Sequence, residues 1–194
     1  MHAQAAVAAD SADATVTVDR VEQVGLLALY GVAVALQFSI AAAQSLLTVA
    51  VACWLVLVIT RRERLVVPRF FWGLVAFAGA TLLSAALSPQ PAAGFADAKQ
   101  LLLFIVVPVA GRFLYGQRGS TMVTVIVSAG AISAAYGIFQ YGILDYNTLD
   151  LRVRGSLGHW MTYSGLLTLV IGVALARILF GERDRLWAAL VMPA

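Results

Sequence analysis

Long apolar stretches separated by short polar segments constrain this sequence more than any other feature. A helix crosses the roughly 30 Å hydrocarbon core of a bilayer with about 20 mostly apolar residues, and such lengths recur throughout the sequence after residue 20. Of the 194 residues, 61% are hydrophobic and 12% are charged. Soluble domains carry about 25% charged residues, because their surfaces face water. The sequence therefore predicts an all-α, multi-pass transmembrane helical bundle.

The apolar stretches predict six complete spans and the start of a seventh. The stretch Val21–Thr60 is long enough for two spans, which we expect to turn near Gln37, Ser39 and Gln44. Four further spans are expected over Phe70–Leu87, Ala98–Tyr115, Met122–Ile143 and Trp160–Phe180, with a kink at Pro108. Leu186–Ala194 begins a truncated seventh.

The two ends of the sequence differ in character from the spans. Residues 1–20 are rich in Ala, Asp and Thr and lack the pattern of a cleavable signal peptide, so we expect a disordered cytoplasmic tail. Residues 21–194 are expected to form one membrane-embedded domain. Because nine residues cannot cross a bilayer, we expect this domain to be the amino-terminal part of a longer protein.

Basic residues are distributed unevenly between the predicted spans. If the spans alternate in direction, the side opposite most arginines receives only Lys99, Arg152 and Arg154. Excess arginine marks the cytoplasmic side of a membrane protein, which places the amino terminus in the cytoplasm. The nine arginines of that side are Arg61, Arg62, Arg64, Arg69, Arg112, Arg118, Arg177, Arg183 and Arg185.

Several classes of site are disfavoured by the composition. The formal net charge of +3 is explained by membrane orientation, so we expect no nucleic-acid partner. Cys53 is the only cysteine, and metal-ligand spacings are absent, so we expect no metal and no cofactor. No charged residue lies near the middle of a predicted span, which disfavours a transporter with a charge relay. Polar residues within the spans are expected to form interhelical hydrogen bonds: Gln37, Gln44, Ser84, Gln140, Tyr163 and Ser164.

The most informative segment is the outer loop from Leu144 to His159. Arg152 and Arg154 alternate with apolar residues, and alternate residues of an extended segment share a face. A turn from Gly155 to Gly158 follows, whose backbone N–H groups can converge on an anion. The next helix begins at His159 or Trp160 and presents the positive end of its dipole. This combination predicts a phosphate-binding site at the outer membrane interface.

Other roles for these residues stay open at this stage. The arginines can pair with Asp150 or Asp145, or extend towards lipid phosphates. Lys99 lies beside Asp97 and suits an interfacial anchor as well as a phosphate ligand. His159 can donate to a phosphate, but no carboxylate is positioned to make it a base. No catalytic residue is assigned.

The segment from Arg152 to Gly165 resembles a motif of the O-antigen ligase and polymerase superfamily of bacterial envelope enzymes. Arg152, Gly155, Gly158 and His159 fall on the pattern of an Arg, a Gly three residues later and a Gly-His step into the next span. The Pro-Asn that commonly follows is replaced by Trp160–Met161. A second similarity is the segment Leu82–Pro91, which precedes Lys99 and a long apolar span.

This resemblance implies a glycosyltransferase of lipopolysaccharide or polysaccharide biosynthesis. Such glycan ligases, polymerases and protein O-oligosaccharyltransferases take a glycan from a polyprenyl diphosphate carrier at the periplasmic face of the bacterial inner membrane. The acceptor is a saccharide, a lipid A core sugar or a protein hydroxyl. The resemblance assigns the diphosphate to Arg152, with Arg154 added by proximity.

The family's favoured catalytic base is a His in a large later periplasmic loop, which has no counterpart in these 194 residues. We therefore expect this chain to be inactive by itself. Two alternatives are a multi-pass transporter of a solute or inorganic carbon and a membrane scaffold without chemistry.

Overall fold

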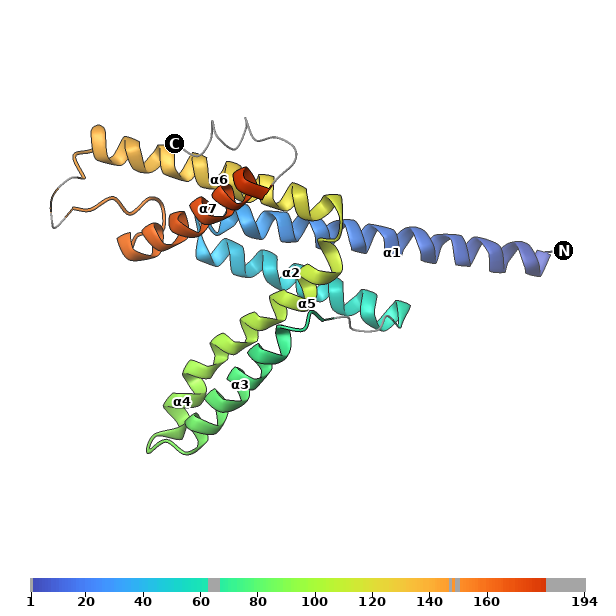
Figure 1. Cartoon of the computed structure of the whole chain (residues 1–194). Helices are drawn as coiled ribbons and strands as arrows, with labels where there is room; N and C mark the ends of the chain where they lie inside the picture. Colours follow the sequence, from blue (N-terminus) through green and yellow to red (C-terminus); the bar gives the residue numbers. More distant parts are fainter. Residues whose placement is uncertain (1, 63–66, 147, 149–150, 181–194) are drawn as a thin grey trace. The chain divides into compact units, whose positions relative to one another are not determined.

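The computed structural model describes residues 2–62, 67–146, 148 and 151–180 (Figure 1). These residues form helices and no β-strand, which confirms the prediction of an all-α chain. The elements are α1 (His2–Ala35), α2 (Ile40–Arg61), α3 (Phe71–Ala86), α4 (Pro91–Ala98), the 3-10 helix η1 (Lys99–Ile105), α5 (Val106–Phe113), α6 (Gln117–Gly142) and α7 (Trp160–Phe180).

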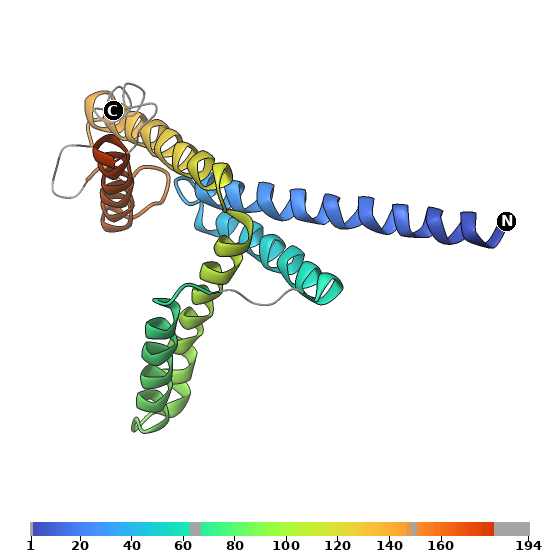
Figure 2. The ribbon, with the colours of Figure 1, turned by 45° about the vertical axis from the view of Figure 1, so that its right-hand side comes forward.

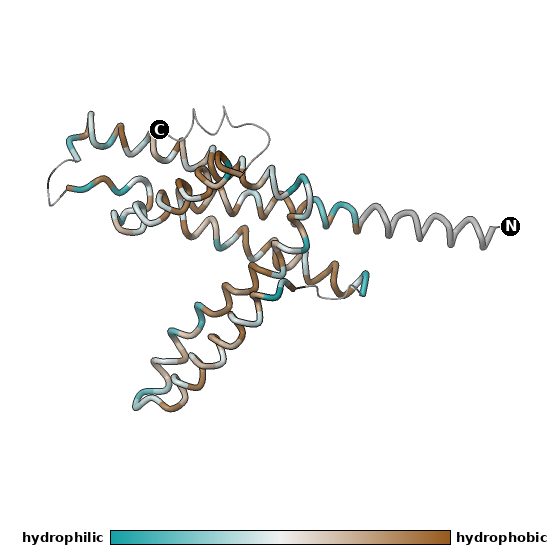
Figure 3. The backbone as a smooth tube through the Cα atoms, in the orientation of Figure 1, coloured by the Kyte–Doolittle hydropathy of each residue, from teal (hydrophilic) through white to brown (hydrophobic). Residues whose placement is uncertain are grey.

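Among the described residues, four helical segments are long and apolar enough to cross a membrane. They are α2, the continuous segment Pro91–Phe113 formed by α4, η1 and α5, and the helices α6 and α7; Figure 3 shows mainly apolar residues along them. Helix α3 is apolar but has 16 residues, which extend about 24 Å. The prediction of six spans is thus confirmed in part, as an all-helical chain with four spanning-length helices. The predicted seventh span, Leu186–Ala194, lies outside the described residues.

Helix α1 differs from the sequence-based prediction at its start. It begins at His2, so the segment predicted as a disordered tail is drawn here as part of a helix. The many alanines of this segment favour helix. Helix α1 ends at Ala35, and α2 begins at Ile40, so the predicted turn is confirmed at Gln37 and Ser39, whereas Gln44 lies within α2. The hydroxyl of Ser39 accepts a hydrogen bond from the N–H of Ala42 (3.4 Å) and caps α2.

The start of the fourth predicted span is corrected by the structure. The helical segment begins at Pro91, whereas the sequence prediction placed the start at Ala98. A proline is favoured at the first position of a helix, where its missing N–H costs nothing. The preceding residues 87–90 form only a short turn after α3. Lys99 therefore lies within a helical segment and is exposed.

Pro108 coincides with a change of helix type. It lies in the first turn of α5, directly after the 3-10 helix η1. Proline cannot donate to the carbonyl four residues earlier, and its ring clashes with that carbonyl. The disturbance predicted at Pro108 therefore takes the form of a tighter helix over Lys99–Ile105.

The chain divides into two compact units, which are described separately. Unit 1 comprises Met1–Gly25 and Ala50–Tyr115, and unit 2 comprises Leu26–Val49 and Gly116–Ala194. In unit 1, Gly25 of α1 packs against the ring of Phe113 and the side chain of Cys53, and Phe113 is fully buried. Cys53 therefore has the packing role that is usual for a small apolar side chain.

In unit 2, helices α6 and α7 pack side by side (Figures 1 and 2). Gly130 faces Val170, and Gly137 faces Tyr163, so the two helices run antiparallel. A side chain at either glycine would collide with its neighbour. Glycine at these two positions lets the two helices pack closely.

Candidate functional site

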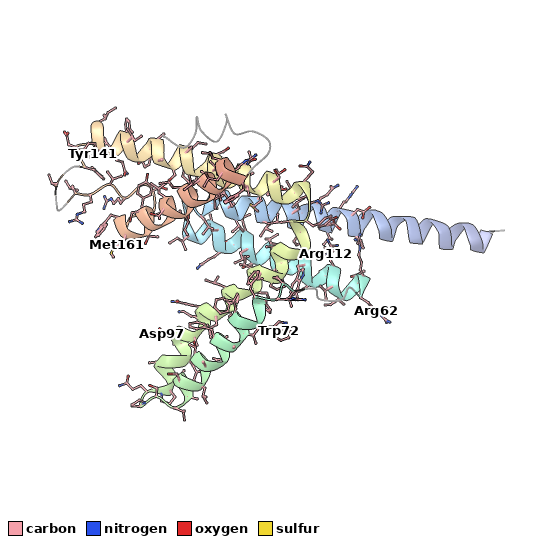
Figure 4. All side chains as sticks on the ribbon, viewed as in Figure 1. Arg62, Trp72, Asp97, Arg112, Tyr141 and Met161 are labelled. Atoms are coloured by element: carbon pink, nitrogen blue, oxygen red, sulfur yellow. The ribbon has the colours of Figure 1, made fainter. Side chains whose placement is uncertain are left out.

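The loop that joins α6 to α7 contains five of the six residues predicted to bind a diphosphate. It belongs to unit 2 and lies at the end of the helix pair that Tyr141 and Met161 mark in Figure 4. The five residues are Arg152, Arg154, Gly155, Gly158 and His159. The sixth, Lys99, belongs to unit 1. The contacts of the loop and of its supporting helices, all in unit 2, define the geometry of the site.

A buried glutamine of α6 holds the backbone of this loop. The carboxamide Nε2 of Gln140 donates to the carbonyl of Gly155 (2.9 Å). Its Oε1 accepts from the N–H of Gly155 (2.9 Å) and from the N–H of Arg154 (3.3 Å). The side chain thus pairs with residue 155 in both directions, as a neighbouring strand does. Gln140 is only 4% exposed, so water does not compete for these bonds.

The two loop glycines adopt left-handed conformations for different reasons. Gly155 has φ +57°, and a Cβ there would lie 2.5 Å from two ring carbons of Tyr163. Gly158 has φ +78° and open space around it. The N–H of Gly155 is donated to Gln140, so the part of the predicted anion cradle that used this group does not hold in this structure. Gly155 shapes the loop instead.

Each loop arginine stacks on an aromatic ring. The guanidinium carbon of Arg152 lies 4.6 Å from the ring centroid of Trp160, and that of Arg154 lies 5.5 Å from the ring of Tyr146. Both distances allow a cation–π attraction. The arginines are exposed. A cation–π contact uses none of the N–H donors of the guanidinium, so these groups can still bind an anion.

Neither loop arginine forms an ion pair with a carboxylate in the described part of the chain. Asp145, one of the two predicted partners, has φ +55° directly after α6 and pairs with neither guanidinium. The other predicted partner, Asp150, lies outside the described residues. Within that range the arginines keep their charge unneutralised.

His159 caps the first turn of α7. Its Nδ1 accepts the N–H of Met161 (3.3 Å), which is the geometry of a side-chain N-cap. A neutral ring with an accepting Nδ1 carries its proton on Nε2, so Nε2 is a donor. The ring also stacks near Trp160, with centroids 6.2 Å apart. The helix start predicted at His159 or Trp160 is confirmed, and His159 supplies the cap.

Beneath the loop, a polar network connects it to the turn between α1 and α2. Ser156 donates to the carbonyl of Gln37 (3.3 Å), and Ser133 of α6 lies at 3.5 Å from the same carbonyl. The hydroxyl of Tyr163 donates to the carbonyl of Ser133 (2.8 Å). The predicted interhelical hydrogen bond is thus confirmed for Tyr163, whereas Gln140 bonds to the loop and Ser164 donates to Met161 of its own helix. The Oε1 atom of Gln37 is buried without a partner among the described residues.

No family model, curated protein or solved structure matches this sequence. The chemistry of the candidate site therefore rests on its residues and their geometry. Those residues offer two cations, a histidine N–H donor and a helix amino terminus, held on a buried polar support.

Proposed function

We propose that this chain forms part of a membrane-embedded glycosyltransferase of the O-antigen ligase type, which binds a polyprenyl diphosphate-linked glycan through Arg152 and Arg154. The observation that carries the proposal is the pair of exposed guanidiniums, each stacked on a ring at 4.6 and 5.5 Å and unpaired with a described carboxylate. The enzyme class is proposed from the resemblance of the segment Arg152–Gly165 to the O-antigen ligase motif.

In the reaction of this enzyme class, the loop would bind the diphosphate leaving group. An acceptor hydroxyl attacks the anomeric carbon and loses its proton to a general base, which in this enzyme class is a His of a later periplasmic loop. The bond from the anomeric carbon to the diphosphate oxygen breaks, and the polyprenyl diphosphate leaves with the bonding electron pair. Negative charge grows on the leaving group in the transition state, and fixed cations stabilise it there more than in the ground state. Arginine suits this role because its planar N–H edge binds two phosphate oxygens at once.

The proposal places the loop at the periplasmic face of a bacterial inner membrane. It includes α1 and α3 as further spans, six in total before a seventh, with a cytoplasmic amino terminus. In unit 1, Arg61 at the end of α2 and Arg112 at the end of α5 both reach Glu22 (3.2 Å each). This agrees with both helix ends facing the same side of the membrane, as alternating spans require.

Orientation is tested with single cysteines in a Cys53→Ser background, in intact cells. An impermeant maleimide should label Leu151→Cys in the loop, where Leu151 is 49% exposed. It should not label Tyr115→Cys, which follows α5 and is 59% exposed. The reverse pattern would place the loop in the cytoplasm and end the proposal.

Binding is tested with the purified chain in lipid nanodiscs and a short-chain polyprenyl diphosphate. Arg152→Ala and Arg154→Ala should each weaken binding about tenfold or more, because a charged hydrogen bond contributes about 1.5–3 kcal/mol. The matched control is Arg69→Ala, which removes an exposed arginine from the opposite predicted side. Wild-type affinity in both loop variants, or an equal loss in the control, would favour a scaffold whose arginines only contact lipid.

A further inference from the structure

Gln140 differs from the other polar residues of the helices in what it binds. Its carboxamide uses both the donor and the acceptor group on one loop residue, Gly155, at 2.9 Å each. The same Oε1 also receives the N–H of Arg154. A glutamine placed only to satisfy helix packing would bond to a neighbouring helix. Here the partner is the backbone of the loop that carries the arginines.

The buried position of Gln140 makes this arrangement selective for one loop conformation. Breaking the bonds would leave the carboxamide and a backbone group buried without hydrogen-bond partners. The free energy lost in this way is larger than the net contribution of a solvent-exposed hydrogen bond. The three bonds involve three successive peptides: the N–H of Arg154, the N–H of Gly155 and the carbonyl of Gly155. The backbone at Arg154 is therefore fixed to the end of α6.

Neighbouring contacts fix the loop on both sides of this point. Ser156 donates to the carbonyl of Gln37 (3.3 Å), and Gly155 lies against the ring of Tyr163. Ahead of Gly155, the guanidiniums of Arg154 and Arg152 reach the rings of Tyr146 and Trp160. The backbone bond therefore holds Arg154 at its main chain, and the ring contacts hold both guanidiniums.

We infer that Gln140 is a positioning residue: it holds the peptide between Arg154 and Gly155 so that the loop presents its two guanidiniums as a preorganised pair to a diphosphate. This inference rests on the proposed function. Preorganisation strengthens binding because the cost of ordering the loop is met on folding and not on association. Gln140 itself does not contact the ligand.

The first test removes the hydrogen-bonding groups with Gln140→Leu, a substitution of similar length. Amide hydrogen exchange over residues 151–158 should become faster without ligand, because Gly155 and Arg154 lose their acceptor. The affinity for a short-chain polyprenyl diphosphate in nanodiscs should fall about tenfold. Far-ultraviolet circular dichroism and size exclusion verify that the helices remain folded.

The second test, Gln140→Glu, separates a loss of binding caused by misfolding from one caused by loss of the hydrogen bonds to the loop. When protonated, the introduced carboxyl can donate to the Gly155 carbonyl and accept its N–H; when ionised, it repels that carbonyl. Relative to wild type at each pH, the affinity of this variant should be lost at pH 8 and recover as the pH is lowered. Wild type corrects for the other ionisable groups around the loop, which are Asp145, Tyr146, Arg152, Arg154, His159 and Tyr163.

The outcomes separate this inference from the proposed function. If Arg152→Ala weakens binding while Gln140→Leu and Gln140→Glu bind like wild type at every pH, the positioning role is overturned and the diphosphate site stands. If Arg152→Ala itself binds like wild type, the diphosphate site is overturned and the inference with it. Faster exchange, weaker binding and recovery of Gln140→Glu at low pH together support the positioning role.

Discussion

Arginines occupy two contrasting environments in this protein. In unit 1, Arg61 pairs with Asp19 (3.1 Å) and Glu22 (3.2 Å), and Arg112 pairs with the same Glu22 (3.2 Å). In the loop of unit 2, Arg152 and Arg154 stack on aromatic rings and meet no described carboxylate. The first pair of arginines uses its N–H groups to join helices, whereas the second pair leaves them available.

Contact with a ring does not by itself distinguish the two environments. Arg112 also lies over a ring, that of Phe113, at 6.0 Å. The difference is the carboxylate: the Glu22 side chain is 14% exposed and reaches two guanidiniums at once. The acid partner, and not the contact with a ring, separates the arginines of unit 1 from those of the loop.

The largest expected effect comes from removing the shared acid. Glu22→Ala should lower the free energy of unfolding by about 2–3 kcal/mol, because hydrogen bonds to a partly buried charge are lost at two arginines. Chemical denaturation in bicelles measures this loss. Asp19→Ala is the matched control, since Asp19 is 71% exposed and an exposed ion pair contributes about 0–1 kcal/mol. Equal losses in the two variants would remove the contrast between buried and exposed pairing.

A smaller effect is expected from Gly155→Ala in the loop. The left-handed backbone and the nearby ring of Tyr163 should together cost about 1–3 kcal/mol. The loss should appear as faster hydrogen exchange over residues 151–158 and weaker diphosphate binding. Gly158→Ala is the control, because residue 158 shares the left-handed φ but has open space around it. If both alanine variants behaved alike, backbone strain alone would explain the glycines and the contact with Tyr163 would have no role.

The smallest effect is expected from the ring under Arg152. Trp160→Leu should weaken diphosphate binding about two- to fivefold, because an exposed cation–π contact contributes about 0.5–1 kcal/mol. The guanidinium stays in the variant but loses its support. Isothermal titration in nanodiscs measures the change, and Trp72→Leu serves as an exposed tryptophan control outside the loop. A loss as large as that of Arg152→Ala would mean that Trp160 contacts the ligand directly.

The fold was predictable wherever a helix boundary coincides with a change from apolar to polar residues. Helix α7 begins at the predicted residue, Trp160, because a glycine-containing loop precedes it. The start of the segment at Pro91 was missed because Pro91–Ala98 is too mixed in polarity to read as part of a span, although a proline at a helix start is a usable signal. Local polarity thus locates spans better than it locates their ends.

The sequence singled out the charged residues of the loop, but not the contacts that hold its backbone. Arg152 and Arg154 stand out in the loop because few other cations occur on that predicted side. The role of Gln140 was missed because it bonds to a backbone 15 residues away, and no sequence period reports such a contact. Glu22 was missed as an ion-pair partner for the same reason, since Arg61 and Arg112 lie 39 and 90 residues along the chain. A lone glutamine near the end of an apolar helix, before a glycine-containing loop, was the one available signal.

The central claim is that the loop arginines, and not the acid-paired ones, bind the diphosphate. Solid-state NMR tests this directly by measuring dipolar coupling between phosphorus-31 of a bound short-chain polyprenyl diphosphate and nitrogen-15 of labelled arginines in nanodiscs. We expect coupling to guanidinium nitrogens that disappears in the Arg152→Ala, Arg154→Ala double variant and persists in Arg61→Ala. Coupling that survives the double variant, or that disappears with Arg61, would contradict the claim.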